Sequence, residues 1–259
     1  MTALDLAQLA RVAEAAADAA RREILPRFRR VSAETKKDGS PVTEADRAAE
    51  RAIRAVLREA TPELGIVGEE YGAEGGADGR AWVVDPIDGT ISFSRGVPLF
   101  GTLIALVEED RPLLGLIDLT AVRERTVGWR GGGVRRNGEP VRVSQRSDLA
   151  DALVAHGDPN TFASFGERDA WLALARDLPR LRGYTDCFGH AQVVCGAVDA
   201  MVDLSLNAWD AAATRVLVEE AGGRCVTFRR DRADYPFGLV FGSPPLVEQL
   251  LGYLSERPR

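Results

Sequence analysis

The stretch WVVDPIDGT, residues 82–90, contains two aspartates that stand three residues apart at the end of an apolar run. Asp85 follows three apolar residues that predict a buried strand, where an unpaired charge is costly. Two carboxylates at about 4 Å repel each other by roughly 4 kcal/mol at an effective dielectric constant of about 20. Asp85 and Asp88 therefore need a cation or a bound proton between them, and this need predicts a metal site.

Magnesium is the metal that these residue types favour. The chain has only two histidines and three cysteines, and the sequence shows no cluster of either that would predict a site for a softer metal. Mg²⁺ prefers oxygen ligands, uses few protein carboxylates, and completes its shell with water and substrate phosphate oxygens. Pro86 would bend the chain so that Asp85 and Asp88 face one point, and the Ile87 carbonyl would be free to serve as a further ligand.

The next two residues, Gly89 and Thr90, predict a phosphate site beside the metal. If a helix begins here, its free N–H groups bind an anion, and glycine allows the anion to approach closely. The Thr90 hydroxyl would orient a nucleophilic water. An EF-hand is excluded because Gly96 stands where that loop needs a glutamate. Glycines 131–133 lack the Gly-Lys-Ser/Thr ending of a phosphate loop and predict a hairpin instead.

Other acids also fall at the ends of predicted elements. Asp46 and Asp210 stand in the first turns of predicted helices, where an acid also stabilises the helix dipole without any catalytic role. Asn207 is placed to cap the second of these helices. Glu69 and Glu70 follow a short predicted strand, and Glu70 is equally compatible with a solvated loop. These acids extend the predicted acidic cluster.

Composition limits the class of protein. The chain has 259 residues, 45% of them hydrophobic, which is enough for one large domain with a sizeable core. Its net charge of −6 gives no reason to expect nucleic acid or an anionic membrane as a partner. The sequence shows no signal peptide and no apolar run long enough to span a membrane. Together with the sparse, odd number of cysteines, these features predict a cytoplasmic protein.

Helices and strands are predicted to alternate in layers. Helical spacing predicts helices at residues 4–26, 43–60, 167–178, 188–198, 208–221 and from 245 onward. Alternating and apolar runs predict strands at residues 65–70, 81–85, 100–108, 112–119, 124–129, 151–156, 200–204, 224–228 and 237–243. Residues 34–41 and the glycine-rich residues 72–79 predict loops, and Asn137-Gly138 predicts a hairpin turn. The whole indicates a layered α/β sandwich.

Four motifs together resemble a known family. They are KKDGSPVTEAD at 36–46, GEE at 68–70, WVVDPIDGT at 82–90 and NAWDAAATRVLVEEAGG at 207–223. In this order, and over nearly the whole chain, they are similar to the inositol monophosphatase-like, Mg²⁺-dependent phosphatases. The resemblance implies an alternating αβαβα sandwich of the inositol monophosphatase and fructose-bisphosphatase type. It also implies a single domain over residues 1–259, with approximate lobes 1–145 and 146–259, that forms a homodimer and hydrolyses small phosphate monoesters.

The resemblance implies a role for each matching acid. Glu69, Asp85 and the Ile87 carbonyl would hold one Mg²⁺. Asp85, Asp88 and Asp210 would hold a second Mg²⁺, and Glu69 would help to hold a third.

The resemblance likewise implies which residues handle water and phosphate. Asp46 and Thr90 would position and deprotonate the attacking water, with Glu69 as a further catalytic residue. Ile87, Asp88, Gly89 and Thr90 would cradle the phosphate.

Three segments resemble the histidinol-phosphatase branch of this family. They are DGTISFSRGVPLFGTLIALVE at 88–108, TDCFGH at 185–190 and MVDLSLNAWD at 201–210. Ile91 and Leu204 differ from that branch, which usually has lysine and proline there. The implied reaction is hydrolysis of L-histidinol phosphate to L-histidinol and phosphate, a step of histidine biosynthesis.

That substrate carries an ammonium and an imidazole, so its binding site needs acceptors beyond the metals. Asp186, Asp203 and Asn207 are the candidates, and Asp210 lies close behind them in the sequence. Their structural alternatives are a turn acid, a strand-end acid and a helix cap. His156 and His190 are predicted to be structural.

Other functions remain open at this stage. An inositol-1-phosphate or broad sugar-phosphate phosphatase is the main alternative, whereas the absence of suitable insertions disfavours a fructose-bisphosphate or 3′-phosphoadenosine phosphatase. A non-catalytic dimeric family member is disfavoured because all the implied metal and water-handling acids are present.

Overall fold

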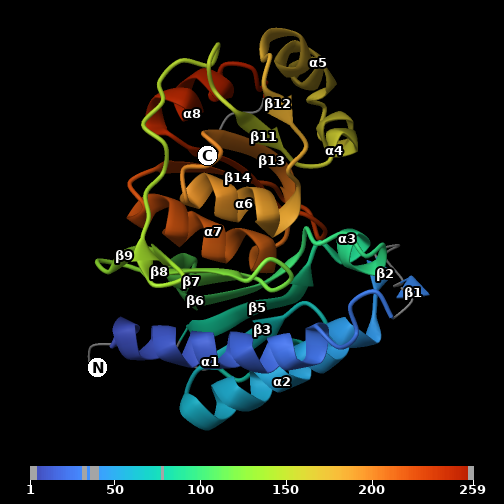
Figure 1. Cartoon of the computed structure of the whole chain (residues 1–259), viewed down its shortest axis with the longest axis vertical. Helices are drawn as coiled ribbons and strands as arrows, with labels where there is room; N and C mark the ends of the chain where they lie inside the picture. Colours follow the sequence, from blue (N-terminus) through green and yellow to red (C-terminus); the bar gives the residue numbers. More distant parts are fainter. Residues whose placement is uncertain (1–4, 31–33, 36–40, 77–78, 256–259) are drawn as a thin grey trace.

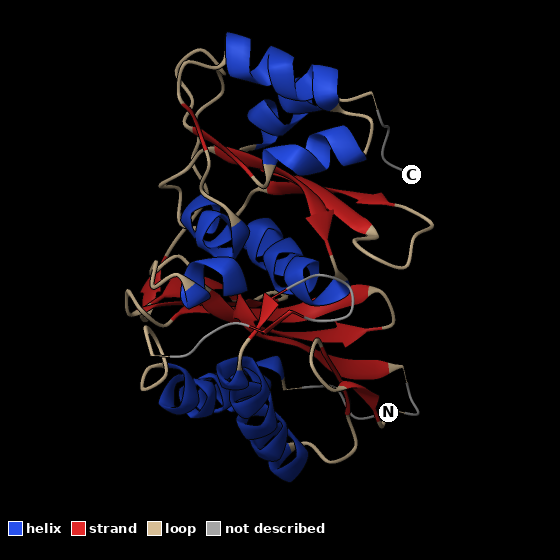
Figure 2. Ribbon diagram, turned by 90° about the vertical axis from the view of Figure 1, so that its right-hand side faces the viewer, coloured by secondary structure: helices blue, strands red, loops and turns tan. Residues whose placement is uncertain are grey.

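Helices and sheets alternate in five layers. The computed structural model describes residues 5–30, 34–35, 41–76 and 79–255. Figure 1 shows two sheets with a pair of helices between them, and the turned view in Figure 2 shows helices covering the outer face of each sheet. The predicted αβαβα sandwich is thus confirmed.

The first layer is a pair of packed helices, α1 (Leu6–Ile24) and α2 (Glu44–Ala60). Their inward faces carry many buried alanines, which allow the two helices to approach each other and the sheet closely. Larger side chains such as Ile53 and Leu57 fill the space between these helices and the sheet. Asp5 begins α1, with its carboxylate accepting the Gln8 N–H at 3.0 Å.

The second layer is an eight-stranded sheet in the order β10-β9-β8-β7-β6-β5-β3-β4. Only the β3–β5 pair is parallel; the other neighbours are antiparallel. The strands are β3 (Gly65–Gly68), β4 (Gly72–Glu74), β5 (Arg80–Asp88), β6 (Gly101–Glu108), β7 (Arg111–Leu119), β8 (Glu124–Trp129), β9 (Gly133–Arg136) and β10 (Glu139–Pro140). Strand β5 is apolar on both faces because helices cover both.

The middle layer consists of α6 (Asp186–Val194) and α7 (Ala208–Glu220). Figure 1 shows both helices between the two sheets. Most side chains of α7 are buried, since it packs against strands of both sheets. The apolar cluster around it includes Leu103 of the first sheet, Met201 of the second sheet and Leu217 of α7.

The second sheet has five strands in the order β12-β11-β13-β15-β14. They are β11 (Val154–His156), β12 (Leu181–Arg182), β13 (Ala200–Leu206), β14 (Arg224–Arg229) and β15 (Phe237–Gly242). Its outer face is covered by α4 (Pro159–Ser164), α5 (Arg168–Asp177) and α8 (Pro244–Leu251). A separate apolar cluster fills the space between these helices and the sheet.

Several local predictions need correction. Residues 72–74 form the edge strand β4 rather than part of a loop, because they pair with β3 across a short turn. Helix α6 spans 186–194 rather than 188–198, and strand β11 is shorter than predicted. The short helices α4 and α3 (Thr90–Ser94) and the two-residue strands β1 (Glu34–Thr35), β2 (Pro41–Val42) and β12 complete the fold. The predicted loop at 34–41 falls mainly on residues 36–40, which lie outside the described residues.

The remaining predicted elements agree with the structure to within a few residues at their ends. Residues 131–140 form the predicted hairpin, with Asn137 in the left-handed conformation at its turn. Within the described part of the chain, no helix is both long enough and apolar enough to cross a membrane.

The packing of α2 on the sheet yields a stability prediction. Leu57→Ala removes a fully buried side chain and is expected to lower the free energy of unfolding by about 3 kcal/mol through lost burial and a residual cavity. Leu172→Ala makes the same chemical change on α5 at a side chain that is 56% exposed, and should change it by less than about 0.5 kcal/mol. Urea unfolding followed by circular dichroism measures both. Equal losses would contradict the assigned core.

Candidate active site

A cavity of about 450 Å³ lies where the ends of both sheets meet the middle helices. Its wall combines segments that are far apart in the sequence: the turn after β3, the end of β5, α3, and the starts of α4, α6 and α7. The sequence-predicted site residues that line it are Glu69, Asp85, Ile87, Asp88, Gly89, Thr90, Asp186, Asp203, Asn207 and Asp210. The structure therefore brings together every predicted site residue except Asp46, which does not line the cavity but contacts Thr90 in its wall.

An irregularity in β5 directs both of its aspartates to this cavity. In a regular strand, side chains three residues apart point to opposite faces. Here Asp85 pairs with Leu103 and Asp88 with Gly101, so three steps on β5 match two steps on β6. The extra residue reverses the alternation of faces: Ile87 packs into the core beneath the sheet, and Asp88 turns to the same side as Asp85. The predicted bend at Pro86 takes the form of this bulge.

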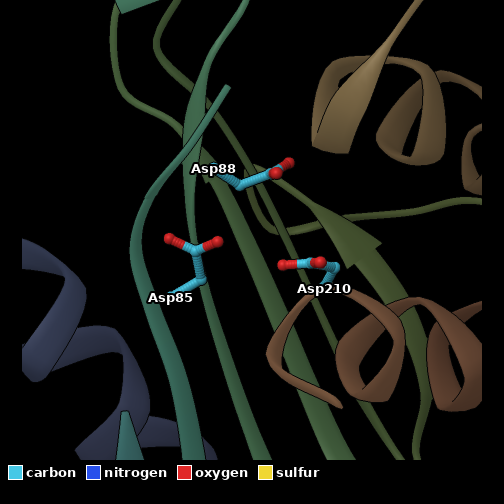
Figure 3. Close-up of side chains that lie close together, drawn as sticks. All are labelled: Asp85, Asp88 and Asp210. Atoms are coloured by element: carbon cyan, nitrogen blue, oxygen red, sulfur yellow. The ribbon is translucent and has the colours of Figure 1, made fainter. Parts of the chain in front are cut away.

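Asp85, Asp88 and Asp210 form a compact acidic cluster. One carboxylate oxygen from each lies within 4.8 Å of the others, and Figure 3 shows their carboxylates converging from β5 and α7. Asp85 and Asp210 are almost completely buried. Burial, followed by the charge of Glu69 and then that of Asp88, raises the pKa of Asp85 well above its ordinary value. The cluster therefore binds protons tightly unless a cation replaces them.

Asp210 is held by the start of α7. Its carboxylate accepts the Asn207 N–H at 2.7 Å, as an acid in the first turn of a helix often does. Burial and the charge of Asp88 nevertheless raise the pKa of Asp210 well above normal. The Asn207 side-chain oxygen accepts the Tyr235 N–H at 3.1 Å, so Asn207 also links α7 to the loop before β15.

Asp88 is tied to the start of α6. Its carboxylate accepts a hydrogen bond from the Cys187 N–H. Burial raises the pKa of Asp88, although the His190 charge and the bond from Cys187 oppose the rise. The neighbouring Asp186 has a left-handed backbone, with φ of 56°. Burial, reinforced by Asp88, raises the pKa of Asp186 to about 7.

Asp46 and Thr90 form a pair at the other side of the cluster. The Thr90 hydroxyl lies 3.3 Å from a carboxylate oxygen of Asp46 and 3.0 Å from the Ile87 carbonyl. The second oxygen of Asp46 accepts the Thr43 N–H at 2.8 Å and the Thr43 hydroxyl at 2.6 Å, which forms a capping box at the start of α2. Burial raises the pKa of Asp46, and the bonds from Thr43 oppose this rise.

Gly89 begins the short helix α3, as the sequence predicts. Its φ is 84°, in the left-handed region that glycine adopts without strain, and a Cβ there would lie 2.8 Å from the Leu99 carbonyl oxygen. The turn leads into the first amides of α3 at the cavity wall. Thr90 and Ile91 both line the cavity.

The distal wall contains residues that the sequence analysis did not select. Asp158, Asn160, Thr161 and Ser164 come from α4 and its cap, and Gly157, Ile91, Ser205, Leu206, Trp209 and Tyr235 complete the wall. The Asp158-Pro159 pair is typical of a helix start and is the local signal that could have predicted α4. Nothing local in the sequence indicates that α4 faces the β5 aspartates.

The two histidines lie outside the cavity wall, as predicted for structural residues. His190 is buried, with Nδ1 2.7 Å from the Thr214 hydroxyl and Nε2 3.3 Å from Asp203. His156 packs against the Trp171 ring. Glu70 is likewise absent from the wall of the cavity as the described residues define it.

The donor set fits a hard divalent cation. The three clustered groups are carboxylates, Glu69 and the Ile87 segment lie in the same wall, and the described residues of that wall include no histidine or cysteine. Such an oxygen-only set suits Mg²⁺ and not a softer metal.

The layered fold and this acidic cavity are typical of phosphatases that use a hard cation, and the comparisons with known proteins identify the family. The chain matches the inositol monophosphatase family over residues 5–257. It is 37% identical to a histidinol-phosphatase of Streptomyces coelicolor, covering 95% of this chain and 97% of that protein. It is 40% identical to a histidinol-phosphatase of Chlorobaculum parvum over 75% of each chain.

Among solved structures, an inositol monophosphatase from Zymomonas mobilis superposes with a TM-score of 0.81. It is 36% identical, and the match covers 97% of this chain and 99% of that one. The chain therefore belongs to the inositol monophosphatase family. The family and these relatives support a phosphatase.

The raised carboxyl pKa values predict how Mg²⁺ and protons compete. A carboxyl with a raised pKa in the folded state stabilises the metal-free fold at low pH, and this contribution is lost as the pH rises through the folded pKa. For Asp186 this contribution to stability is lost over the pH range between its ordinary pKa of about 4 and its raised pKa of about 7. We expect the increase in melting temperature caused by Mg²⁺, relative to EDTA, to grow between about pH 5 and pH 8.

Differential scanning fluorimetry at stepped pH measures this increase. Asp118→Asn is the control, because Asp118 is a buried carboxylate in the described chain that does not line the cavity, and it should leave the pH dependence unchanged. An Mg²⁺ effect of equal size at pH 5 and pH 8 would contradict the prediction.

Proposed function

We propose that this protein is a Mg²⁺-dependent phosphomonoesterase that hydrolyses L-histidinol phosphate to L-histidinol and phosphate, a step of histidine biosynthesis. The observation that carries the proposal is the convergence of Asp85, Asp88 and Asp210 at one cavity, beside Glu69 and the Thr90–Asp46 pair. Buried carboxylates this close together favour a bound cation, and a cation beside a helix start suits a phosphate.

The proposed metal ligands are Glu69, Asp85, the Ile87 carbonyl, Asp88 and Asp210, for two or three Mg²⁺. When bound, the metal lowers the pKa of water and neutralises charge on the phosphoryl oxygens. The Ile87 carbonyl accepts the Thr90 hydroxyl at 3.0 Å in this structure, and its second lone pair would be available to a metal.

Asp46 and Thr90 are the proposed water-handling pair. The Thr90 hydroxyl, 3.3 Å from Asp46, would hold the attacking water, and Asp46 would receive its proton through that contact. Burial raises the pKa of Asp46, and a general base whose pKa lies closer to neutrality removes a proton more effectively. The turn from Ile87 through Gly89 to Thr90 would cradle the phosphate with backbone N–H groups.

The substrate assignment depends on the charge of the distal wall. Asp186, Asp203 and Asn207 line the same cavity as the proposed metal ligands, and Asp158 adds a further acid. Carboxylates suit an ammonium and an imidazole better than they suit an uncharged polyol. The histidinol-phosphatase relatives support the same choice.

An inositol-1-phosphate or broad sugar-phosphate phosphatase is the second candidate, supported by the similarity to the Zymomonas mobilis inositol monophosphatase. A non-catalytic family member is the third, and the intact cluster disfavours it.

We further propose a single domain with lobes 1–145 and 146–259, and a cytoplasmic homodimer that binds neither nucleic acid nor membranes. Light scattering on the purified chain would test the homodimer.

The metal requirement is tested by phosphate release. With Mg²⁺ the purified protein is expected to release phosphate from the substrate, and with EDTA the release should fall to background, since the metal carries the charge neutralisation. Asp88→Asn should lower kcat/KM roughly a hundred-fold or more, because it removes both a charge and a proposed ligand. Equal release with Mg²⁺ and with EDTA would exclude the metal mechanism.

The substrate is tested by comparing kcat/KM for histidinol phosphate and myo-inositol 1-phosphate. We expect histidinol phosphate to be preferred, and Asp203→Asn to raise its KM roughly ten-fold, about 1.4 kcal/mol, with little change in kcat. The KM for the uncharged inositol ester serves as the control and should change less. A ten-fold preference for the inositol ester would contradict the substrate assignment and favour the second candidate. An unchanged KM for histidinol phosphate in Asp203→Asn would exclude Asp203 from substrate binding.

A further inference from the structure

A buried ion pair on α2 lies directly behind Glu69. Glu50 is fully buried and the Arg54 side chain is 3% exposed, with Arg54 Nε 2.8 Å from a Glu50 carboxylate oxygen. Removing two charges from water costs several kcal/mol in proteins, and an apolar pair of similar size is often as stable. The pair therefore calls for an explanation other than stability.

The contacts of the pair converge on the turn between β3 and β4. One Glu50 oxygen accepts the Glu70 N–H at 2.7 Å, and the other accepts the Tyr71 N–H at 3.3 Å. Arg54 donates to the Gly72 carbonyl at 2.5 Å. Three consecutive residues after Glu69 are thus held by two side chains of one helix.

The residue before Glu69 is held just as closely. A Cβ on Gly68 would overlap the Glu50 carboxylate and would lie 2.9 Å from an Arg54 nitrogen, so the ion pair packs against the bare backbone of this glycine. From the other side, the Glu69 N–H donates to the Val84 carbonyl at 3.2 Å, one residue before Asp85. The backbone of Glu69 is therefore clamped between α2 and β5.

The same helix also carries Asp46. Asp46 and Glu50 are four residues apart and lie on one face of α2. Through Asp46 the helix contacts Thr90, and through Glu50 it contacts the Glu69 turn. One rigid element thereby contacts both the Thr90 turn and the Glu69 turn.

We propose that Glu50 and Arg54 are positioning residues for Glu69. They fix the turn that aims the Glu69 carboxylate at Asp85, and in this way they set the affinity of the site for Mg²⁺. The inference rests on the proposed metal-dependent function and deepens it. Among the described residues that line the cavity, neither Glu50 nor Arg54 appears, so both would act through Glu69. If the pair only stabilised the fold, its loss would lower the melting temperature and leave the affinity for Mg²⁺ unchanged.

The chain contains a matched control for that alternative. Asp118 is fully buried and accepts Arg21 at 2.6 Å and Arg125 at 2.9 Å, so it too is a buried acid paired with arginine. These residues join α1, β7 and β8, whereas the Glu69 turn follows β3. Asp118→Asn therefore reports the cost of disrupting a buried ion pair without moving Glu69.

The experiment measures Mg²⁺ binding to the full chain without substrate, by titration calorimetry and by the rise in melting temperature with Mg²⁺ concentration. Glu50→Gln keeps the side-chain size but places an amide N–H₂ against backbone N–H donors. It is expected to raise the Kd for Mg²⁺ ten-fold or more, whereas Asp118→Asn should keep Kd within two-fold of the wild type. The Mg²⁺ concentration for half-maximal activity should shift in parallel, with KM at saturating Mg²⁺ unchanged.

Arg54→Lys provides a milder second variant, needed if Glu50→Gln does not fold. Lysine keeps the charge beside Glu50 but lacks the forked head group that also reaches the Gly72 carbonyl, so a smaller rise in Kd is expected. A folded Glu50→Gln or Arg54→Lys protein with the wild-type Kd would overturn the inference and leave the proposed function intact. A wild-type protein that binds no Mg²⁺ would overturn both.

Discussion

Electrostatic repulsion among buried carboxylates is the constraint on which this site depends. One carboxylate oxygen of each of Asp85, Asp88 and Asp210 lies within 4.8 Å of the others, and burial, followed by the charges of neighbouring acids, raises the pKa of Asp85 and of Asp210. Such a cluster is tolerable only with protons or cations among the oxygens. A phosphatase exploits this requirement, because the cation that relieves the repulsion also binds the negatively charged substrate.

The sandwich architecture makes the convergence possible. Asp85 and Asp88 come from the first sheet, Asp203 from the second, and Asp186 and Asp210 from the starts of the helices between them. The outer helix α2 carries Asp46, which contacts Thr90, and Glu50, which binds the Glu69 turn. Each layer beside the cavity therefore supplies a group on a rigid element, which suits a site that must hold several charges at short distances.

The cavity has two chemically distinct ends. The end at β5 and α7 has the closely spaced acids expected for metal and phosphate. The other end is lined by α4 and by Tyr235, whose N–H is held by Asn207. Metal chemistry is common to the inositol monophosphatase family, so differences in substrate among its members are expected to reside in the distal wall.

The sequence by itself determined which residues are candidates for the chemistry and which elements carry those residues. Apolar periodicity, helix caps and the spacing of Asp85 and Asp88 depend on local interactions, and local interactions are visible in a linear chain. Only the tertiary structure decided that the β5 bulge turns Asp88 to the side of Asp85, and that α4 closes the distal wall. It also decided that Glu50 and Arg54, which look like ordinary surface charges of an amphipathic helix, are buried behind Glu69. These features arise from strand register and from packing between distant segments, and their energies depend on partners that the local sequence does not contain.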